Sequence, residues 1–188
     1  MKFLIASDIH GSAYFCRLLL EKIEQEKADR VLLLGDILYH GPRNDLPCEY
    51  APKKVIEMLN PLKNKLLCVR GNCDTEVDQM VLPFSIMDET ATLEIDGRTW
   101  FMAHGHRKGA NPTEGDLPSL PQGSVILSGH THLPVLKEDE VGNLYLNSGS
   151  ISLPKGGYVA SYAIYDGKHF KIKSLDGEIL MEISETRV

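Results

Sequence analysis

Five short apolar runs, each followed directly by residues that bind metal ions, constrain the fold of this chain more than any other feature. The runs cover residues 3–6, 31–34, 66–69, 100–103 and 125–127, and each has the length and composition of a buried β-strand. The segments that follow them are Asp8-Ile9-His10, Gly35-Asp36, Gly71-Asn72-Cys73-Asp74, His104-Gly105-His106 and Gly129-His130-Thr131-His132. In an α/β sheet, functional groups gather beyond the carboxyl ends of strands. The sequence therefore predicts an α/β fold in which five strand ends converge on a site for two metal ions.

The remaining pattern predicts one domain over residues 1–188, with two stacked sheets and outer helices. Apolar residues at helical spacing predict a helix over residues 12–27, with Ser12 as its N-cap, and a second over residues 52–59. A short third helix is predicted over residues 74–82. Strands that are apolar on both faces in the first half indicate a sheet covered on both sides.

The second half of the chain is predicted to be rich in strands. Asp-Gly pairs at residues 96–97, 166–167 and 176–177 predict three β-hairpins. The segment 107–123 is rich in Gly and Pro and is predicted to be a loop with at most one short helix. The C-terminal hairpins offer sheet edges that could pair between subunits, so a homo-oligomer stays open.

The bulk composition narrows the classes of function. The formal net charge of -6 argues against binding of long nucleic acids, because proteins that bind them use a basic surface. Asp8 interrupts the apolar start too early for a signal peptide, and no run approaches the length of a transmembrane helix. We therefore expect a cytoplasmic protein with no membrane partner.

The residue types in the five segments suit a pair of transition-metal ions. Two ions about 3.5–4 Å apart can clamp the attacking and leaving oxygens of a phosphoryl displacement. A mixture of oxygen and imidazole ligands suits Mn, Fe, Co, Ni or Zn better than Ca or Mg. Asp8 and His10 lie two residues apart, as do His130 and His132, so in an extended segment each pair would point to one side. Each motif alone is weak, but five of the seven histidines fall in these segments, and the combination is specific.

The order of these motifs resembles that of the calcineurin-like metallophosphoesterase family. The resemblance covers residues 1 to about 150 and rests on Asp8-x-His10, Gly35-Asp36, Gly71-Asn72-x-Asp74, His104 and Gly129-His130-x-His132. The short length, the Asn72-Cys73-Asp74 motif and the segment Asn147-Ser148-Gly149-Ser150 look like the small bacterial phosphodiesterase branch. The resemblance implies a four-layer α/β/β/α sandwich of two mixed sheets flanked by helices. It also implies two divalent metal ions, with Mn²⁺ expected first and Zn²⁺, Fe²⁺, Co²⁺ or Ni²⁺ as alternatives.

The resemblance further implies a role for each ligand and a reaction. The implied ligands are Asp8, His10 and His132 for one metal, Asn72, His104 and His130 for the other, and Asp36 as the bridge. The implied reaction is hydrolysis of a small phosphodiester by in-line attack of a hydroxide that bridges the metals. Asp74 is expected to orient a neighbouring group rather than to bind metal.

Cys73 is a candidate catalytic residue that departs from the family pattern, because many members carry histidine there. That histidine is implied to stabilise the transition state or to protonate the leaving group, and a thiol is a poor substitute for both. Asp8 and Asp36 would leave two of the metals' positive charges, which one hydroxide and one phosphodiester monoanion would neutralise. A monoester dianion would overshoot unless a cationic group lay nearby. The hypothesis that follows is that Cys73 biases the enzyme toward diesters.

Four other residues are weighed for contacts near the site. Arg43, on the loop after the bridging Asp36, is the favoured phosphate contact, because a guanidinium binds phosphate bidentately. His106 could contact substrate or protonate the leaving group. For His40 a contact with the site is left open, and for Arg70 a salt bridge is favoured over a phosphate contact.

Two alternatives to a phosphodiesterase remain. A phosphomonoesterase or a nucleotide pyrophosphohydrolase could use the same dinuclear site. The retromer scaffold subunit has a similar fold with an incomplete ligand set and serves as a binding module. This chain keeps every ligand position, so a non-catalytic scaffold is the less favoured reading.

Overall fold

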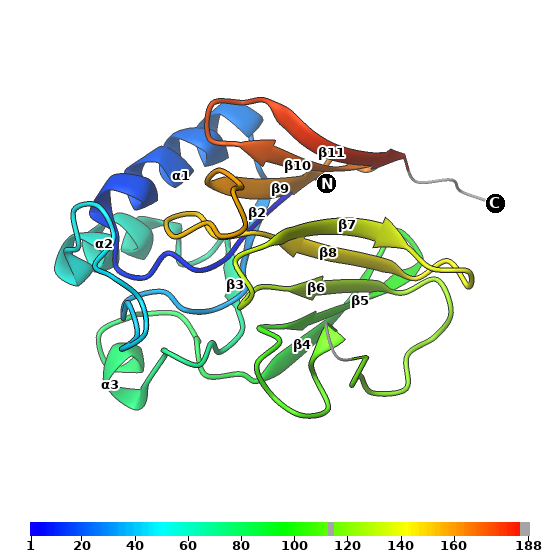
Figure 1. Cartoon of the computed structure of the whole chain (residues 1–188), viewed down its shortest axis with the longest axis horizontal. Coiled ribbons are helices and arrows are strands. Elements are labelled where there is room, and N and C mark those ends of the chain that lie inside the picture. Colours follow the sequence, from blue (N-terminus) through cyan, green and yellow to red (C-terminus); the bar gives the residue numbers. More distant parts are fainter. Residues whose placement is uncertain (113–114, 185–188) are drawn as a thin grey trace.

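Two β-sheets stack against each other in the computed structural model, which describes residues 1–112 and 115–184 (Figure 1). The strand order is β11-β10-β9-β1-β2-β3 in one sheet and β4-β5-β6-β8-β7 in the other. The strands are β1 (Phe3–Ala6), β2 (Arg30–Leu33), β3 (Leu66–Cys68), β4 (Thr90–Ile95), β5 (Arg98–Ala103), β6 (Val125–Ser128), β7 (Pro134–Glu138), β8 (Leu144–Ser148), β9 (Ser161–Tyr165), β10 (His169–Ser174) and β11 (Ile179–Ser184). Each sheet contains parallel and antiparallel pairs. The predicted fold class, two stacked mixed sheets with flanking helices, is confirmed.

The helices follow the predicted positions closely. They are α1 (Ala13–Glu26), α2 (Pro52–Leu59), the 3₁₀ turn η1 (Asn60–Leu62) and α3 (Glu76–Gln79). The Ser12 hydroxyl caps α1 by accepting a hydrogen bond from the backbone N–H of Phe15. α3 is shorter than the predicted 74–82: Thr75 and Asp78 form a capping box at its start, and it has no buried residue to stabilise further turns. None of the described helices combines the length and the hydrophobicity needed to cross a lipid bilayer.

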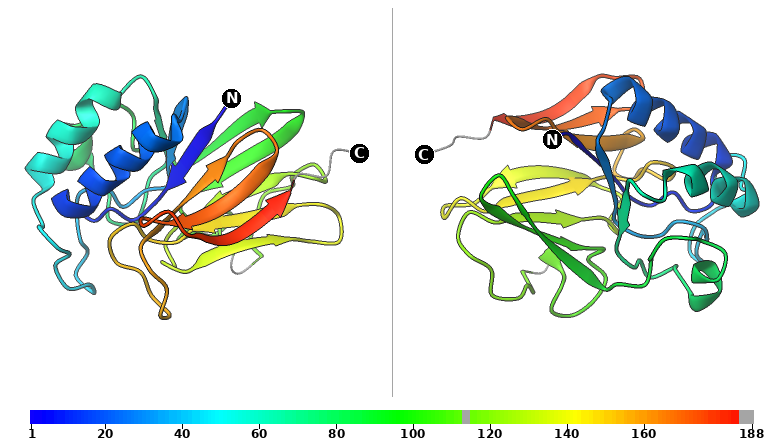
Figure 2. Two further views of the ribbon diagram at one scale, coloured as in Figure 1. Left: turned by 90° about the horizontal axis from the view of Figure 1, so that it is seen from above. Right: turned by 180° about the vertical axis from the view of Figure 1, so that it is seen from behind.

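Side-chain alternation along β1 explains why both faces of its sheet are covered. Leu4 and Ala6 belong to a core formed with α1 and α2, whereas Phe3 and Ile5 belong to a second core formed with the five-stranded sheet. Trp100 of β5 lies in this second core and is 1% exposed. The helices therefore cover one face of the six-stranded sheet and the second sheet covers the other, as Figure 2 shows from two sides.

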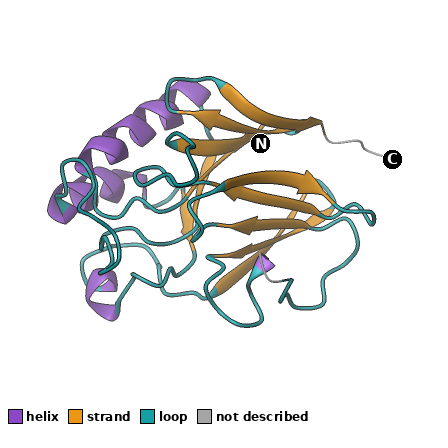
Figure 3. Ribbon diagram, in the orientation of Figure 1, coloured by secondary structure: helices purple, strands orange, loops and turns teal. Residues whose placement is uncertain are grey.

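Loops cover the outer face of the five-stranded sheet, where the four-layer arrangement implied by the resemblance places a second layer of helices. Phe101 and Ile126 pack there against Leu117 and Leu120 of the loop after β5. The described residues of the predicted loop 107–123 form turns and a bridge between residues 111 and 116, while residues 113 and 114 lie outside the described part. Figure 3 shows the helices α1 and α2 beside the six-stranded sheet and mostly loops around the other sheet. The loops that follow β1, β2, β3, β5 and β6 carry the predicted metal ligands.

Candidate metal centre

Unusual backbone conformations position the predicted ligands. Eight of the described non-glycine residues have a positive φ, and five of these eight are predicted ligands: Asp8 (59°), His10 (50°), Asp36 (56°), His130 (66°) and His132 (60°). Left-handed conformations are costly for residues with a side chain and occur where the chain turns sharply. Asp8 and His10 do point toward one place, as expected. The expected reason, an extended segment, is wrong, because both residues are left-handed. Tight turns at the strand ends, rather than the pleat of a strand, direct these side chains.

Asp8, His10 and His132 come together as a buried group. Asp8 Oδ1 lies 3.1 Å from His132 Nε2 and 3.5 Å from His10 Nε2, and the two Nε2 atoms are 3.2 Å apart. The Nδ1 atoms of His10 and His132 face the backbone carbonyls of Tyr39 at 2.8 Å and Leu153 at 2.6 Å. Each Nδ1 therefore donates its hydrogen to a carbonyl, which leaves the Nε2 lone pairs directed at the carboxylate. Asp8 Oδ1 has no hydrogen-bond donor among the described residues.

His104, Asn72 and Asp36 meet in a similar way. His104 Nδ1 faces the carbonyl of Leu34 at 2.6 Å, and its Nε2 lies 3.2 Å from Asn72 Oδ1 and 3.5 Å from Asp36 Oδ2. Asp36 Oδ2 also lies 3.7 Å from His10 Nε2. Asp36 thus stands between the two groups of ligands, which is where a bridging carboxylate would lie.

The carboxylates and imidazoles of this cluster need a cation between them. Burial raises the pKa of Asp8 and Asp36, but the neighbouring imidazoles lower it further, so both carboxyls stay ionised. Burial lowers the pKa of His10 and His104, but the two carboxylates raise it more, to about 9 for His104. A proton satisfies this demand in the metal-free protein, and a divalent cation satisfies it with better geometry for several lone pairs at once. The donor set therefore fits a metal centre.

His130, the seventh predicted ligand, lies beside this cluster. Its ring centroid is 5.1 Å from that of His104, and its backbone N–H donates to Asp8 Oδ2 at 3.1 Å. Burial and the positive charges of His104 and Arg43 lower the pKa of His130, so its imidazole is neutral and free to act as a ligand.

Asp74 holds the loop of the bridging residue and lies away from the cavity. Its Oδ2 accepts hydrogen bonds at 2.8 Å from the N–H groups of Asp36 and Gly71, and its Oδ1 accepts one at 2.9 Å from Ile37. A Cβ atom on Gly71 would overlap the Asp36 carboxylate, so only glycine fits there. These contacts agree with the orienting role expected for Asp74.

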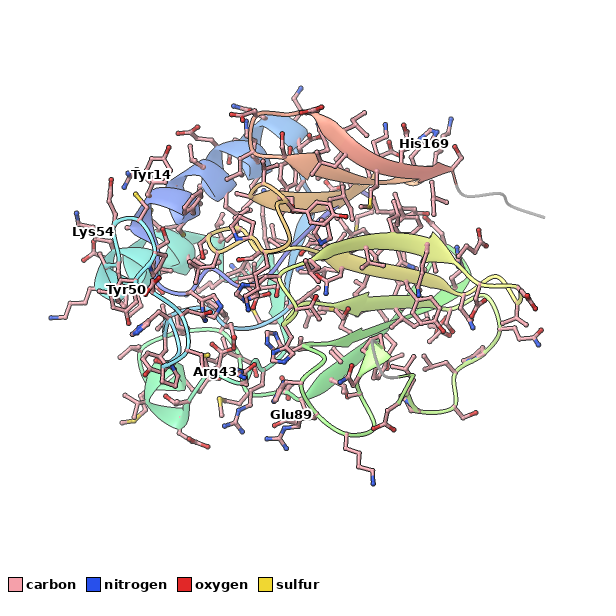
Figure 4. All side chains as sticks on the ribbon, in the orientation of Figure 1. Tyr14, Arg43, Tyr50, Lys54, Glu89 and His169 are labelled. Carbon is pink, nitrogen blue, oxygen red and sulfur yellow. The ribbon has the colours of Figure 1, made fainter. Side chains whose placement is uncertain are left out.

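An open cavity of about 360 Å³ lies over the ligands. Arg43, the predicted phosphate contact, lines this cavity. Figure 4 labels Arg43 on the loop after β2. Asn44, Thr131 and Lys155 line the cavity as well. Sequence reasoning missed Asn44 and Lys155. The available signal for Lys155 was weak: it follows Pro154 in a Gly-rich loop after β8.

Cys73 is buried beneath the cavity rather than on its wall. Its Sγ accepts a hydrogen bond from Asn72 Nδ2 at 3.1 Å, and its N–H donates to Asp36 Oδ1 at 2.7 Å. Burial and the Asp36 carboxylate raise the pKa of the thiol, which stays protonated. The charge argument for diesters required that no cationic group lie nearby, and Arg43 and Lys155 contradict that premise. Cys73 contacts the loop of the bridging Asp36, but the charge argument that linked Cys73 to a preference for diesters fails.

The other weighed residues lie off the cavity wall. The His106 ring meets the His104 ring edge to face, with ring centroids 5.3 Å apart, and burial and the charge of His104 lower the pKa of His106 to about 4. At neutral pH its ring is the neutral imidazole, so the imidazolium form that would serve as a strong acid toward a leaving group is not populated. Arg70 pairs with Glu89 at 3.4 Å, in agreement with the favoured salt bridge, and the His40 ring packs on Tyr50.

A two-sheet sandwich with carboxylate, amide and imidazole groups converging at its strand ends defines a metalloprotein of the α/β class. The sequence matches the calcineurin-like phosphoesterase superfamily domain over residues 1–169. The chain belongs to this superfamily, which confirms the resemblance drawn from the motifs.

Relatives with the same architecture agree with this assignment. Phosphodiesterase YfcE of Escherichia coli (strain K12) is 43% identical over 182 residues, which cover 96% of each chain. The solved structure of YfcE, a phosphoesterase from E. coli, superposes with a TM-score of 0.92 and covers 98% of this chain and 99% of its own. Zinc-bound Vps29 from Entamoeba histolytica is 19% identical, with a TM-score of 0.64 and coverage of 98% and 99%. The likeness to Vps29 concerns the fold alone.

Proposed function

We propose that the protein is a metal-dependent phosphodiesterase that hydrolyses small phosphodiesters. The convergence of Asp8, Asp36 and the ligand imidazoles beneath an open cavity is the observation that carries this proposal. Membership of a phosphoesterase superfamily and 43% identity to a phosphodiesterase support the reaction class. The net charge of -6 supports a small substrate over a long nucleic acid. We place the enzyme in the cytoplasm.

We propose two divalent ions, with Mn²⁺ as the first candidate. Asp8, His10 and His132 would hold one ion; Asn72, His104 and His130 would hold the other, with Asp36 between them. When bound, such ions supply Lewis acidity toward the phosphoryl oxygens and a nucleophile at neutral pH. The mixed oxygen and imidazole donors suit Mn²⁺ and its first-row neighbours.

The residues of the cavity wall would position the substrate. The Arg43 guanidinium is planar and can bind two non-bridging phosphate oxygens at once, whereas the Lys155 ammonium acts as a point charge. Asp74 would keep Asp36 in place through the hydrogen bonds to its backbone. Burial of the ligands at the cavity floor excludes water from the groups that carry the charge.

A phosphomonoesterase is the second candidate, and one observation favours it. Arg43 and Lys155 supply the cationic groups that a monoester dianion requires beside the metals. Parallel turnover of a nitrophenyl monoester and a bis(nitrophenyl) diester by the same preparation decides between them. A higher kcat/KM for the diester is expected, and a higher value for the monoester would reverse the assignment.

The central test uses Asp36→Ala with Mn²⁺ supplied. Loss of the bridging carboxylate is expected to lower kcat for bis(nitrophenyl) phosphate by at least about 10²-fold. Metal analysis is expected to give two ions per wild-type chain and fewer in the variant. Asp176→Ala, at the exposed hairpin turn after β10, is the matched control and should change neither quantity. Undiminished turnover by Asp36→Ala would overturn the dinuclear assignment.

A further inference from the structure

A second, smaller pocket adjoins the cavity over the metal ligands. This side pocket has a volume of about 170 Å³. Its walls include Pro112, Leu133, Val135, Lys137 and Tyr145, together with Thr131. Thr131 lines both cavities, so the side pocket and the cavity over the metal ligands are neighbours on either side of this residue.

The Thr131 hydroxyl has an unused hydrogen-bond donor among the described residues. Its Oγ1 accepts a hydrogen bond from Asn147 Nδ2 at 3.2 Å and faces the backbone N–H of Leu133 at 3.3 Å. A hydroxyl has two acceptor lone pairs and one donor hydrogen, so both lone pairs are occupied. The hydroxyl hydrogen has no acceptor among the residues described here, and an oxygen of a bound phosphate at the junction of the two cavities would provide one.

The side pocket itself favours an apolar, flat group. Leu133, Val135 and Pro112 present aliphatic carbon, and Tyr145 presents a ring. The Tyr145 hydroxyl is already bonded to Asp139 Oδ2 at 3.3 Å. A bound group therefore meets a carbon-rich surface and few unsatisfied polar atoms.

The Asn147 side chain, which also lines the side pocket, is hydrogen-bonded internally. Asn147 Nδ2 donates to the carbonyl of Gly129 at 2.7 Å, and Asn147 Oδ1 accepts from the N–H of Gly149 at 3.0 Å. Lys137 lies at one wall, with its Nζ 5.5 Å from the centroid of the Tyr145 ring. The only formal charge that the pocket wall offers among the described lining residues is therefore positive, which suits the electron-rich face of an aromatic ring.

We propose that the side pocket binds an aromatic ring carried by one ester group of the substrate, while the Thr131 hydroxyl donates a hydrogen bond to an oxygen on phosphorus. The size agrees, because a cavity of about 150 Å³ with apolar walls holds one benzene ring. This inference rests on the proposed phosphodiesterase function and specifies its substrate class: a diester with at least one aryl group.

Two phosphonates that are not hydrolysed test the ring. Phenylphosphonate and methylphosphonate differ only in the group that would enter the side pocket, and both are titrated calorimetrically into the Mn²⁺-loaded protein. Phenylphosphonate is expected to bind about tenfold or more tightly. Equal affinities would overturn the proposal.

Variants of the pocket wall locate the effect. Val135→Phe fills the side pocket and should bring the ratio of the two affinities toward one, with methylphosphonate binding unchanged. Val141→Phe adds the same ring at an exposed turn between β7 and β8 and should keep the wild-type ratio. Leu133→Ala removes one wall at a residue that is 37% exposed, so it provides a second variant if Val135→Phe does not fold. A wild-type ratio in both pocket variants would contradict the inference.

Thr131 variants test the hydrogen bond separately. Thr131→Val should weaken both phosphonates by the same factor, because the lost hydroxyl contacts phosphorus oxygens rather than the ring, and Thr131→Ser should restore both. Mn²⁺ affinity should stay unchanged, whereas a purely structural role between His130 and His132 would lower it. If only the inference about the side pocket fails, the protein still hydrolyses diesters. If the proposed function fails, no diester turnover is seen.

Discussion

His130 offers a direct test of the backbone strain at the metal centre. At φ 66° the left-handed conformation costs a residue with a Cβ about 1–2 kcal/mol, and glycine avoids this cost. Glycine gains more conformational freedom in the unfolded chain, which costs about 0.4–1 kcal/mol relative to alanine. We therefore expect metal-free His130→Gly to be more stable than His130→Ala by roughly 0.5–1 kcal/mol, net of the two effects. Both variants lose the same imidazole, so the comparison isolates the backbone.

The assay is thermal and urea unfolding in the presence of a chelator. For a chain of this size, about 1 kcal/mol corresponds to a shift in Tm of roughly 2–4 °C. His106 is the matched control, because it belongs to the same site and has no positive φ. There the order should reverse, with His106→Ala more stable than His106→Gly by about 0.4–1 kcal/mol. Equal or greater stability of His130→Ala over His130→Gly would refute the strain argument.

Two further predictions concern stability and metal binding. Burial raises the pKa of Glu26, but Lys173 and Lys2 lower it more, below its usual 4.5, so the stabilisation is present above pH 4.5 and is lost as the pH falls through the folded-state value. Glu26→Gln should therefore lower the free energy of unfolding by about 0.5–1 kcal/mol at neutral pH, because solvent screens this partly exposed pair, and by less in acid; equal losses in urea unfolding at both pH values would contradict this. Gly71→Ala should reduce Mn²⁺ affinity by about 10–100-fold in a calorimetric titration, because the added Cβ overlaps the Asp36 carboxylate, and wild-type affinity would argue against that clash.

The strand ends were predictable because each joins an apolar run to a polar segment. The β1, β5 and β6 segments, both long helices and the three Asp-Gly hairpins follow from periodicity and turn chemistry. The hairpin at Asp96 and Gly97 has φ values of 51° and 80°, as this turn requires. These elements follow from local rules. The helices and hairpins have hydrogen bonds between residues that are close in the sequence, and the buried strands each show a continuous apolar run.

Contacts between distant loops could not be predicted in the same way. Lys155 reaches the cavity from a loop after β8, and no spacing rule connects it with Asp36 or Arg43. The charge argument about Cys73 failed because its count left out the cations of the cavity wall, which are Lys155 and the already predicted Arg43. The handedness of the backbone at Asp8 was also missed, because aspartate carries no visible mark of a left-handed turn in a sequence.

The strained turns and the converging lone pairs have one physical origin. The side chains that follow five different strands must reach one point beneath the cavity, so the chain has to turn sharply where each strand ends. Left-handed residues such as Asp36 make that turn. The same convergence sets Asp8 Oδ1 against two imidazole nitrogens, and a proton or a metal ion must lie between them and the carboxylate. Both costs fall on the metal-free protein and both are offset when cations bind. Metal affinity is therefore set by how firmly Asp74 and the Nδ1 hydrogen bonds keep the ligands in place, as well as by the ligands themselves.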